Sequence, residues 1–308
     1  MVDLNNFSKR VVLKINPYTR RVIWALFIGI LSAFIPFSTH LLLLNSIDSV
    51  HANKFTQTAS AETPAQTRIK SAMWGGPILF HQGSGEPVHL ILVEKALQKL
   101  YLYRYDGRYQ LVKSYTCSTG EKNGTKRQEK DEKTPEGIYF NVKEYRDSKI
   151  TIFGDRAFGL NYPDVFDDLE GNSGGGIFLH GANRGIKPFK TNGCVILSND
   201  DISDLDNRIQ IKSTPVIIGE RLPYEFKPAT NEMSELIPLF KQAMLPKHYV
   251  NLESEFSYIT VIGFQDRIVV FSEVLINDSK NLVGFSRLYL SRPADNLLVL
   301  LKRKWQEK

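Results

Sequence analysis

An uncharged apolar segment near the N-terminus most constrains what this chain can fold into. Residues 22–44 (VIWALFIGILSAFIPFSTHLLLL) carry no charged side chain and are long enough to cross a bilayer as a helix. The short segment before them, residues 1–21, contains Lys9, Arg10, Lys14, Arg20 and Arg21. Because basic residues stay on the cytoplasmic side of a membrane, we predict a cytoplasmic basic segment over 1–21, a transmembrane helix or signal anchor over 22–44, and export of everything that follows.

Two fates of this helix remain open. Val50 and Ala52 give the small-x-small pattern of a signal-peptidase site, with cleavage after Ala52. The apolar run and the segment before it are longer than is usual in a signal peptide, which favours a retained anchor. We therefore expect the protein in the periplasm or at the outer face of the cytoplasmic membrane, held by residues 22–44.

Composition narrows the class of partner. The chain has 308 residues, of which 42% are hydrophobic and 23% charged, as in ordinary globular proteins. Its net charge is +6, but basic and acidic residues are interspersed, so we expect no nucleic-acid partner and a mild attraction to anionic polymers or membrane surfaces. The two cysteines, Cys117 and Cys194, exclude a disulfide-rich scaffold and a CxxC metal site. We expect no metal and no cofactor.

The part of the chain predicted to be exported divides into three segments that differ in composition and hydrophobic periodicity. Residues 45–86 are rich in Thr, Ala, Gln and Ser and predict a flexible linker. Residues 87–220 contain short alternating apolar runs, with an Asp-Gly hairpin signal at 106–107, and predict a mostly β domain with little helix. Residues 221–308 begin with a helical apolar period at 231–244 and continue with four strand-like runs, which predicts a small α+β module.

Cys194 and His180 are the candidate catalytic pair. A cysteine becomes a nucleophile as its thiolate, which requires a nearby base or cation, and histidine is the natural base at neutral pH. A glycine, Gly193, precedes the cysteine and permits a tight turn. We predict that the amides of Asn192, Gly193 and Cys194 form an oxyanion hole. By residue type alone, a buried structural cysteine and a structural histidine are the more frequent outcome.

The sequence motifs around Cys194 and His180 carry more information than the residue types of the pair alone. His180-Gly181 is followed by Thr191-Asn192-Gly193-Cys194, and upstream stand Thr134-Pro135-Glu136-Gly137 and the sequence FGLNYP at 158–163. Together these resemble the catalytic domain of the L,D-transpeptidases, the YkuD-like family, over residues 88–220. The resemblance implies a β-sandwich or barrel with short helices.

The resemblance also implies a mechanism and a substrate. Cys194 would be the nucleophile and His180 the base, with the backbone carbonyl of Gly181 as the third member of the catalytic group. The substrate would be the stem peptide of peptidoglycan, cut between the L-centre of residue 3 (diaminopimelate) and D-alanine 4 through an acyl-enzyme. Cell-wall biogenesis, a role in cell shape and inhibition by carbapenem-type β-lactams would follow.

Substrate-binding roles are predicted for Thr191, Tyr162, Asn183 and Arg184. Tyr162 and Arg184 line the donor site, or else are core packing and surface charge respectively. Asn183 bonds the donor peptide or caps a turn.

Several positions depart from the family pattern. Asn192 stands where many members have histidine, and Val195, Ile196 and Leu197 stand where many have an arginine or asparagine. These departures leave L,D-carboxypeptidase and L,D-transpeptidase activity both open, and with the anchor and the lack of a glycan-binding module they favour hydrolysis. The alternative from another class is a non-catalytic peptidoglycan-binding or scaffolding protein that retains the fold.

Three further expectations concern residues outside the motif. Cys117 is predicted as a buried small side chain, with a redox partnership with Cys194 as the alternative. The acidic run Asp164, Asp167, Asp168 and Glu170 lacks the pattern of a calcium loop and predicts a solvated lid. The C-terminal module is either NTF2-like, as accompanies some L,D-carboxypeptidases of the family, or a plain packing or partner-binding module.

Overall fold

The computed structural model describes residues 78–83, 89–146, 151–222, 231–277, 282–291 and 298–307. Residues 66–308 form one compact unit. The predicted basic segment, the predicted transmembrane helix and most of the predicted linker lie outside the described residues. Within the ranges described, no helix combines the length and the hydropathy needed to span a bilayer.

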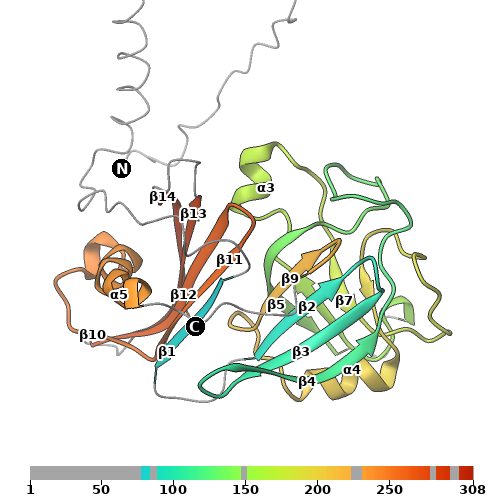
Figure 1. Cartoon of the computed structure of the whole chain (residues 1–308), viewed down its shortest axis with the longest axis horizontal. Helices are drawn as coiled ribbons and strands as arrows, with labels where there is room; N and C mark the ends of the chain where they lie inside the picture. The colour runs from blue at the N-terminus through green and yellow to red at the C-terminus, as the bar shows by residue number, and fades with distance from the viewer. Residues whose placement is uncertain are drawn as a thin grey trace, which may run out of the picture. The chain divides into compact units, whose positions relative to one another are not determined.

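Eight strands make up the larger sheet: β2 (His89–Glu94), β3 (Lys99–Tyr105), β4 (Tyr109–Thr116), β5 (Gly137–Tyr145), β6 (Ala157–Leu160), β7 (Phe178–His180), β8 (Val195–Ile196) and β9 (Pro215–Gly219). Their order is β4-β3-β2-β9-β5-β6-β7-β8, and β2, β3 and β4 are seen side by side in Figure 1. The first three form an antiparallel meander, and Gly107 supplies the left-handed residue of the second turn, at φ 71°. β7 and β8 pair in parallel at the opposite end of the sheet, beside the candidate catalytic pair.

The smaller sheet has six strands: β1 (Ile78–Gly83), β10 (Ser254–Phe256), β11 (Tyr258–Phe264), β12 (Arg267–Ile276), β13 (Leu282–Ser291) and β14 (Val299–Glu307). The order is β1-β11-β12-β13-β14, with β10 beside β12. All neighbouring pairs are antiparallel. The four apolar runs predicted as strands in the C-terminal module are therefore β11 to β14.

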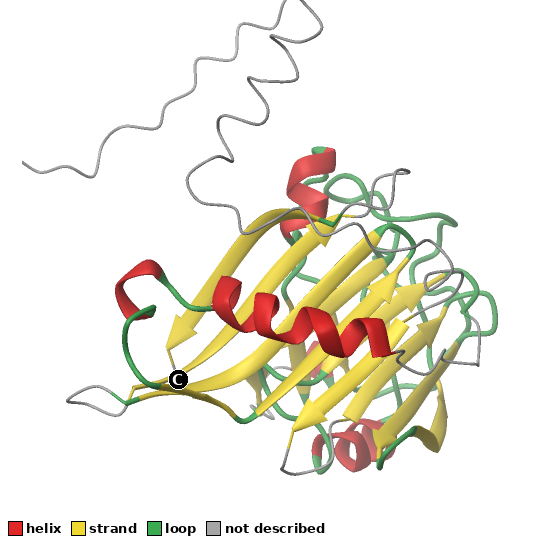
Figure 2. Ribbon diagram, turned by 60° about the vertical axis from the view of Figure 1, so that its left-hand side comes forward, coloured by secondary structure: helices red, strands yellow, loops and turns green. Residues whose placement is uncertain are grey.

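The described helices are short except for one. They are α3 (Val165–Glu170), α4 (Asn199–Asp206), α5 (Asn231–Met244) and the 3-10 turns η2 (Thr151–Phe153) and η3 (Lys247–Tyr249). Ser198 caps α4 by accepting a hydrogen bond from the Asp201 amide, as its position before the helix predicts. α5 crosses the outer face of the smaller sheet (Figure 2).

Strand alternation divides the apolar side chains among three layers of core. On β2, Ile91 and Val93 face α4 and the β7–β8 end of the fold, whereas Leu90 and Leu92 face the smaller sheet. The core between the two sheets also holds Val269, Phe271 and Tyr289, and α5 covers the far face of the smaller sheet. The C-terminal module thus shares a continuous core with the predicted catalytic domain.

The linker prediction was wrong at its C-terminal end. Residues 78–83 form β1, which pairs with β11 along six residues. Glycines and prolines flank this short apolar run on both sides, so the local composition of the segment is typical of a linker. Its partner strand lies far downstream in the sequence, so the pairing leaves no local signal.

Candidate active site

Strand register brings Cys194 and His180 to the same face. β7 and β8 pair Leu179 with Val195 and His180 with Ile196. Extending this register one residue back sets Cys194 opposite Phe178, two residues before His180. Since side chains alternate along strands, Leu179 and Val195 point into the core, both 1% exposed, and the cysteine and histidine share the opposite face. The structure therefore brings the predicted pair together at the edge of the sheet.

The histidine is held in one tautomer. His180 Nδ1 lies 2.7 Å from the carbonyl oxygen of Gly181, so Nδ1 carries the proton and donates it to this carbonyl, while Nε2 is left as an acceptor. The ring is buried and packs edge-on against Phe153. Burial lowers the pKa of His180 and outweighs the Gly181 carbonyl, which raises it. A neutral imidazole with a free Nε2 is the form that a general base requires.

The thiol of Cys194 is protonated at rest. Burial raises its pKa, against two effects that lower it: the Phe178 backbone amide and the positive charge of Lys126. The Sγ atom lies 3.6 Å from the carbonyl oxygen of Gly176. A neutral thiol next to a neutral imidazole indicates that the proton moves when substrate binds, rather than before.

Lys126 is a buried cation that sequence reasoning missed. The run 121–133 is rich in charged residues and forms a loop, but Lys126 within it is 2% exposed. Its Nζ lies 2.8 Å from Asp131 Oδ1 and 2.9 Å from the Gln128 carbonyl oxygen. The same loop packs against the glycine-rich segment before β7, where a Cβ on Gly174 would meet the Glu129 backbone at 3.1 Å. This loop is therefore a wall of the site, and it carries the charge that favours the thiolate.

The turn before the cysteine is built by two threonines. Thr191 Oγ1 accepts from the Gly193 amide at 3.0 Å and donates to the Cys194 carbonyl at 2.7 Å. Thr134 Oγ1 accepts from the Gly120 amide at 2.9 Å and donates to the Gly193 carbonyl at 3.0 Å. Gly193 itself has φ 126°, and a Cβ there would lie 2.7 Å from a backbone oxygen of the neighbouring loop. The Thr-Pro-Glu-Gly sequence thus contributes the side chain that holds this turn.

These contacts correct two predicted roles. The Gly193 amide was expected in the oxyanion hole, but Thr191 already accepts its hydrogen. The amides of Asn192 and Cys194 are left as the candidate donors. Thr191 was expected to bind substrate, but its side chain is 6% exposed and both its hydrogen bonds are internal.

Asn199 locks the loops around the histidine, and it too was missed. Its Oδ1 accepts from the Asp155 amide at 3.2 Å, and its Nδ2 donates to Asn183 Oδ1 at 3.0 Å. A Cβ on Gly154 or Gly181 would approach this same Oδ1 to 2.2 and 2.4 Å respectively. The glycine after His180 is therefore required by the asparagine that packs on it. The two glycines in the adjoining loops, Gly154 and Gly181, are the sequence signal for such a close approach.

The remaining residues predicted to bind substrate differ in their exposure to solvent. Tyr162 is 6% exposed, within the core, and its hydroxyl lies 3.2 Å from the Lys126 carbonyl oxygen, so it shapes the wall rather than offering a free hydroxyl. Asn183 and Arg184 are exposed on the loop that follows the histidine. Their predicted contact with substrate stays a prediction.

Cys117 lies in the core and is fully buried, and burial raises its pKa to about 12. Both cysteines are free thiols. The predicted buried small side chain is confirmed, and the fold offers no support for a redox partnership with Cys194.

The acidic run departs from the predicted solvated lid at two of its four residues, since Asp168 and Glu170 are exposed but Asp164 and Asp167 are not. Asp164 caps α3, and both it and Asp167 are fully buried. Burial, together with the negative charge of Asp167, raises the pKa of Asp164 to about 7. Nowhere in the described ranges do three or more histidine, cysteine or acidic side chains cluster as a metal ion would require.

Comparison with known proteins finds a family that residues 88–218 resemble. Residues 88–218 match the model of the YkuD family, the L,D-transpeptidase catalytic domain. Among curated proteins, none matches the chain in sequence.

Two solved structures share the fold. Bd1075 of Bdellovibrio bacteriovorus is 22% identical, with a TM-score of 0.57 over 75% of this chain and 97% of its own. Pgp2 of Campylobacter jejuni, described as a helical cell shape determining protein, is 19% identical, with a TM-score of 0.55 over 76% of this chain and 97% of its own. Both likenesses cover more of the chain than residues 88–218, so the shared architecture extends past the family domain.

Proposed function

Because residues 88–218 belong to the YkuD family of L,D-transpeptidase catalytic domains, we propose that this protein is a cysteine enzyme acting on the stem peptides of peptidoglycan. The bond that it cleaves joins the L-centre of diaminopimelate, residue 3, to D-alanine 4. One observation carries the proposal. The 2.7 Å contact between His180 Nδ1 and the Gly181 carbonyl leaves Nε2 free to act as a base on the face that Cys194 shares.

In the acylation step, His180 Nε2 takes the proton of the Cys194 thiol as Sγ attacks the carbonyl carbon of residue 3. The oxygen becomes an oxyanion, which the amides of Asn192 and Cys194 stabilise. When the tetrahedral intermediate collapses, the C–N bond breaks and D-alanine leaves with the proton from the imidazolium. The product is a thioester on Cys194. The charge of Lys126 favours the sulfur anion along this path.

Deacylation repeats these roles with a second nucleophile. His180 removes a proton from water or from an acceptor amine, which attacks the thioester and releases Cys194. Water yields a tripeptide, as in an L,D-carboxypeptidase, and an amine yields a cross-link, as in an L,D-transpeptidase. We favour water, since apolar Val195 and Leu197 are buried and Ile196 is partly buried where many members have an arginine or asparagine.

We further propose that the enzyme works outside the cytoplasmic membrane, tethered by residues 22–44, and that it contributes to cell shape. The apolar segment and the basic residues before it support the tether. The likeness in fold to Pgp2, described as a cell shape determining protein, supports the second part.

The test is incubation of the purified protein with tetrapeptide muropeptides, beside a Cys194→Ala variant, with products identified by mass spectrometry. Tripeptides that are absent from the variant would establish L,D-carboxypeptidase activity, and cross-linked dimers would establish transpeptidation. A folded, reduced protein that yields neither product, and that a carbapenem does not acylate, would overturn the proposal in favour of a non-catalytic scaffold.

A further inference from the structure

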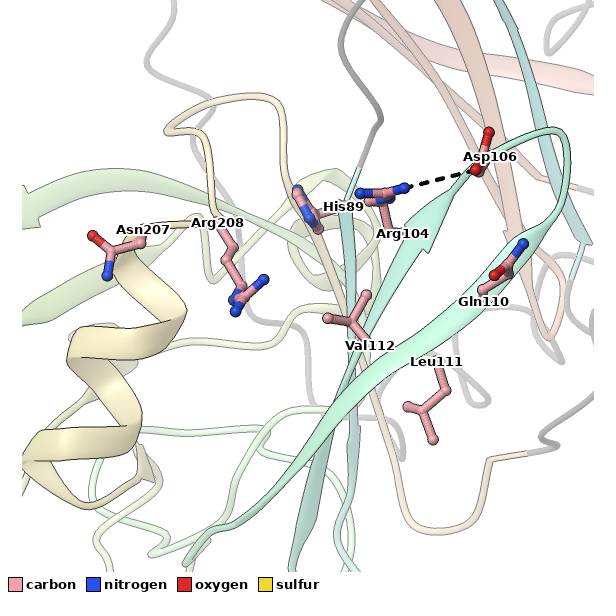
Figure 3. A pocket seen from close by; sticks show the side chains of 8 residues that line it. All are labelled: His89, Arg104, Asp106, Gln110, Leu111, Val112, Asn207 and Arg208. Atoms are coloured by element: carbon pink, nitrogen blue, oxygen red, sulfur yellow. Dashed lines mark ion pairs between the residues drawn. The ribbon is translucent and has the colours of Figure 1, made fainter.

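A hollow lies away from Cys194, at the opposite edge of the larger sheet. It has a volume of about 350 Å³ and is bounded by β2, β3, β4 and the end of α4. His89 and Arg104 are paired across β2 and β3. In Figure 3 their side chains lie next to one another, and Arg208 lies on the other side of His89, after the end of α4. We call this hollow the arginine pocket.

The arginine pocket has an excess of positive charge. Its one lining carboxylate, Asp106, lies 3.6 Å from Arg104, and this pair is largely exposed and hence weak. Arg208 contacts Asp204 at 3.4 Å, and among the described residues its Nε has no acceptor. Burial and then the charges of Arg208 and Arg104 lower the pKa of His89. An anion bound beside these side chains would offset the positive charge that acts on His89.

The walls indicate what kind of anion would fit. Guanidinium groups bind carboxylates through paired hydrogen bonds. Beside them, Leu111 and Val112 on β4 are 54% and 39% exposed. A carboxylate next to apolar atoms, as in a peptide that carries acidic and alkyl side chains, matches both features.

Helix α4 connects the arginine pocket to the site. It begins at Asn199, which packs on Gly181, the residue after His180, and it ends at Asp206, two residues before Arg208. Its eight residues span about 12 Å, and four extended peptide residues span about 13 Å. A polymer bearing several short acidic peptides could therefore reach both places at once.

We propose that the arginine pocket binds a carboxylate of a peptidoglycan stem peptide other than the one being cleaved, so that the polymer is docked while Cys194 acts. This inference rests on the proposed function for its ligand. It adds a non-catalytic binding site whose loss weakens the hold on polymer but leaves the cleavage of a small, single-peptide substrate unchanged.

The test compares two double variants of the full chain in detergent. Arg104→Gln with Arg208→Gln removes the charge of the arginine pocket, and Lys247→Gln with Lys302→Gln removes the same charge from exposed positions outside it. Each pair is placed in the Cys194→Ala background for binding to purified sacculi and in the wild-type background for turnover of a single tetrapeptide muropeptide. We expect binding to sacculi to weaken about tenfold in the arginine variant only, with turnover of the muropeptide retained in both.

Two further measurements make the result specific. Arg104→Lys with Arg208→Lys keeps the charge and should restore part of the binding. Binding of soluble muropeptide should raise the pKa of His89, followed by NMR, because a carboxylate beside the imidazole favours its protonated form.

If the Arg104→Gln, Arg208→Gln protein binds sacculi as tightly as the control protein in which two exposed lysines are replaced, the proposal is overturned, whether or not the protein cleaves muropeptides. Retention of inorganic phosphate by the arginine pocket without any response to muropeptide would overturn it as well, and would identify a phosphate site instead. If the wild-type protein cleaves no muropeptide but still binds sacculi through the arginine pocket, the proposed enzyme activity is refuted and the docking site is supported.

Discussion

Thr134 offers the sharpest test of how the catalytic turn is held. It is fully buried, and its hydroxyl joins two backbone groups, the Gly120 amide at 2.9 Å and the Gly193 carbonyl at 3.0 Å. Thr134→Val retains the shape of the side chain but leaves both groups buried without a partner. Each such group costs about 1–3 kcal/mol, so we expect a loss of about 3 kcal/mol in the free energy of unfolding.

The matched control is Thr134→Ser, which keeps the hydroxyl and loses one methyl group, at a cost of about 1 kcal/mol. For a domain of this size, a destabilisation of about 3 kcal/mol lowers Tm by about 6–12 °C, measurable by circular dichroism. The valine variant should also be acylated by a carbapenem about 10²-fold more slowly, because the freed turn no longer aims the amide of Cys194 at the oxyanion. If Thr134→Val unfolds at the same temperature as Thr134→Ser, then the hydroxyl does not hold the turn and the reasoning fails.

Further predictions follow from the backbone and the titrating groups. Gly193→Ala should slow acylation far more than Gly185→Ala, because a Cβ at Gly193 meets a backbone oxygen at 2.7 Å and at Gly185 meets nothing within 4 Å; equal rates in stopped-flow assays would contradict this. Because burial raises the pKa of Cys194, its alkylation by iodoacetamide should accelerate steadily as pH rises, whereas a plateau from acid pH would indicate a preformed ion pair. Cys117, with its pKa raised to about 12, should stay unmodified in the native protein when peptides are mapped by mass spectrometry. Asp164 has a folded pKa of about 7 against 3.8 for a free carboxyl, so its ionisation destabilises the fold as pH rises through 7; Asp164→Asn, which can still cap α3, should therefore raise Tm at pH 8.5 more than at pH 5.5, and an equal effect at both would refute the assignment.

The sequence predicted the elements that local pattern determines. The β2–β3–β4 meander, the strand that ends at His180 and the amphipathic helix α5 all follow from alternation, turn residues or helical period. The pairing of His180 with Cys194 was predicted from two short sequence motifs, His-Gly at 180–181 and Thr-Asn-Gly-Cys at 191–194. Strand β1 was missed because its pairing with β11 is a tertiary contact.

Side-chain direction limited what could be predicted for the site. Thr191 and Tyr162 stand within the motifs, yet both are buried and bond within the protein. Lys126 lies in a strongly charged run, and its ion pair with Asp131 and its hydrogen bond to the Gln128 carbonyl allow it to be buried. Asn199 acts through two loops distant in the sequence, so its contacts exist only in the folded chain.

The position of β1 has a consequence for how the chain must fold. The smaller sheet is assembled from one strand that precedes residues 88–218 and five strands that follow them, so the family domain is an insertion within the second sheet. His81 on β1 and Thr260 on β11 are hydrogen-bonded across 179 positions of sequence. Contacts of such high order form late and slowly. Strand β1 therefore waits for the strands at the far end of the sequence, and the smaller sheet closes only once nearly the whole polypeptide is present.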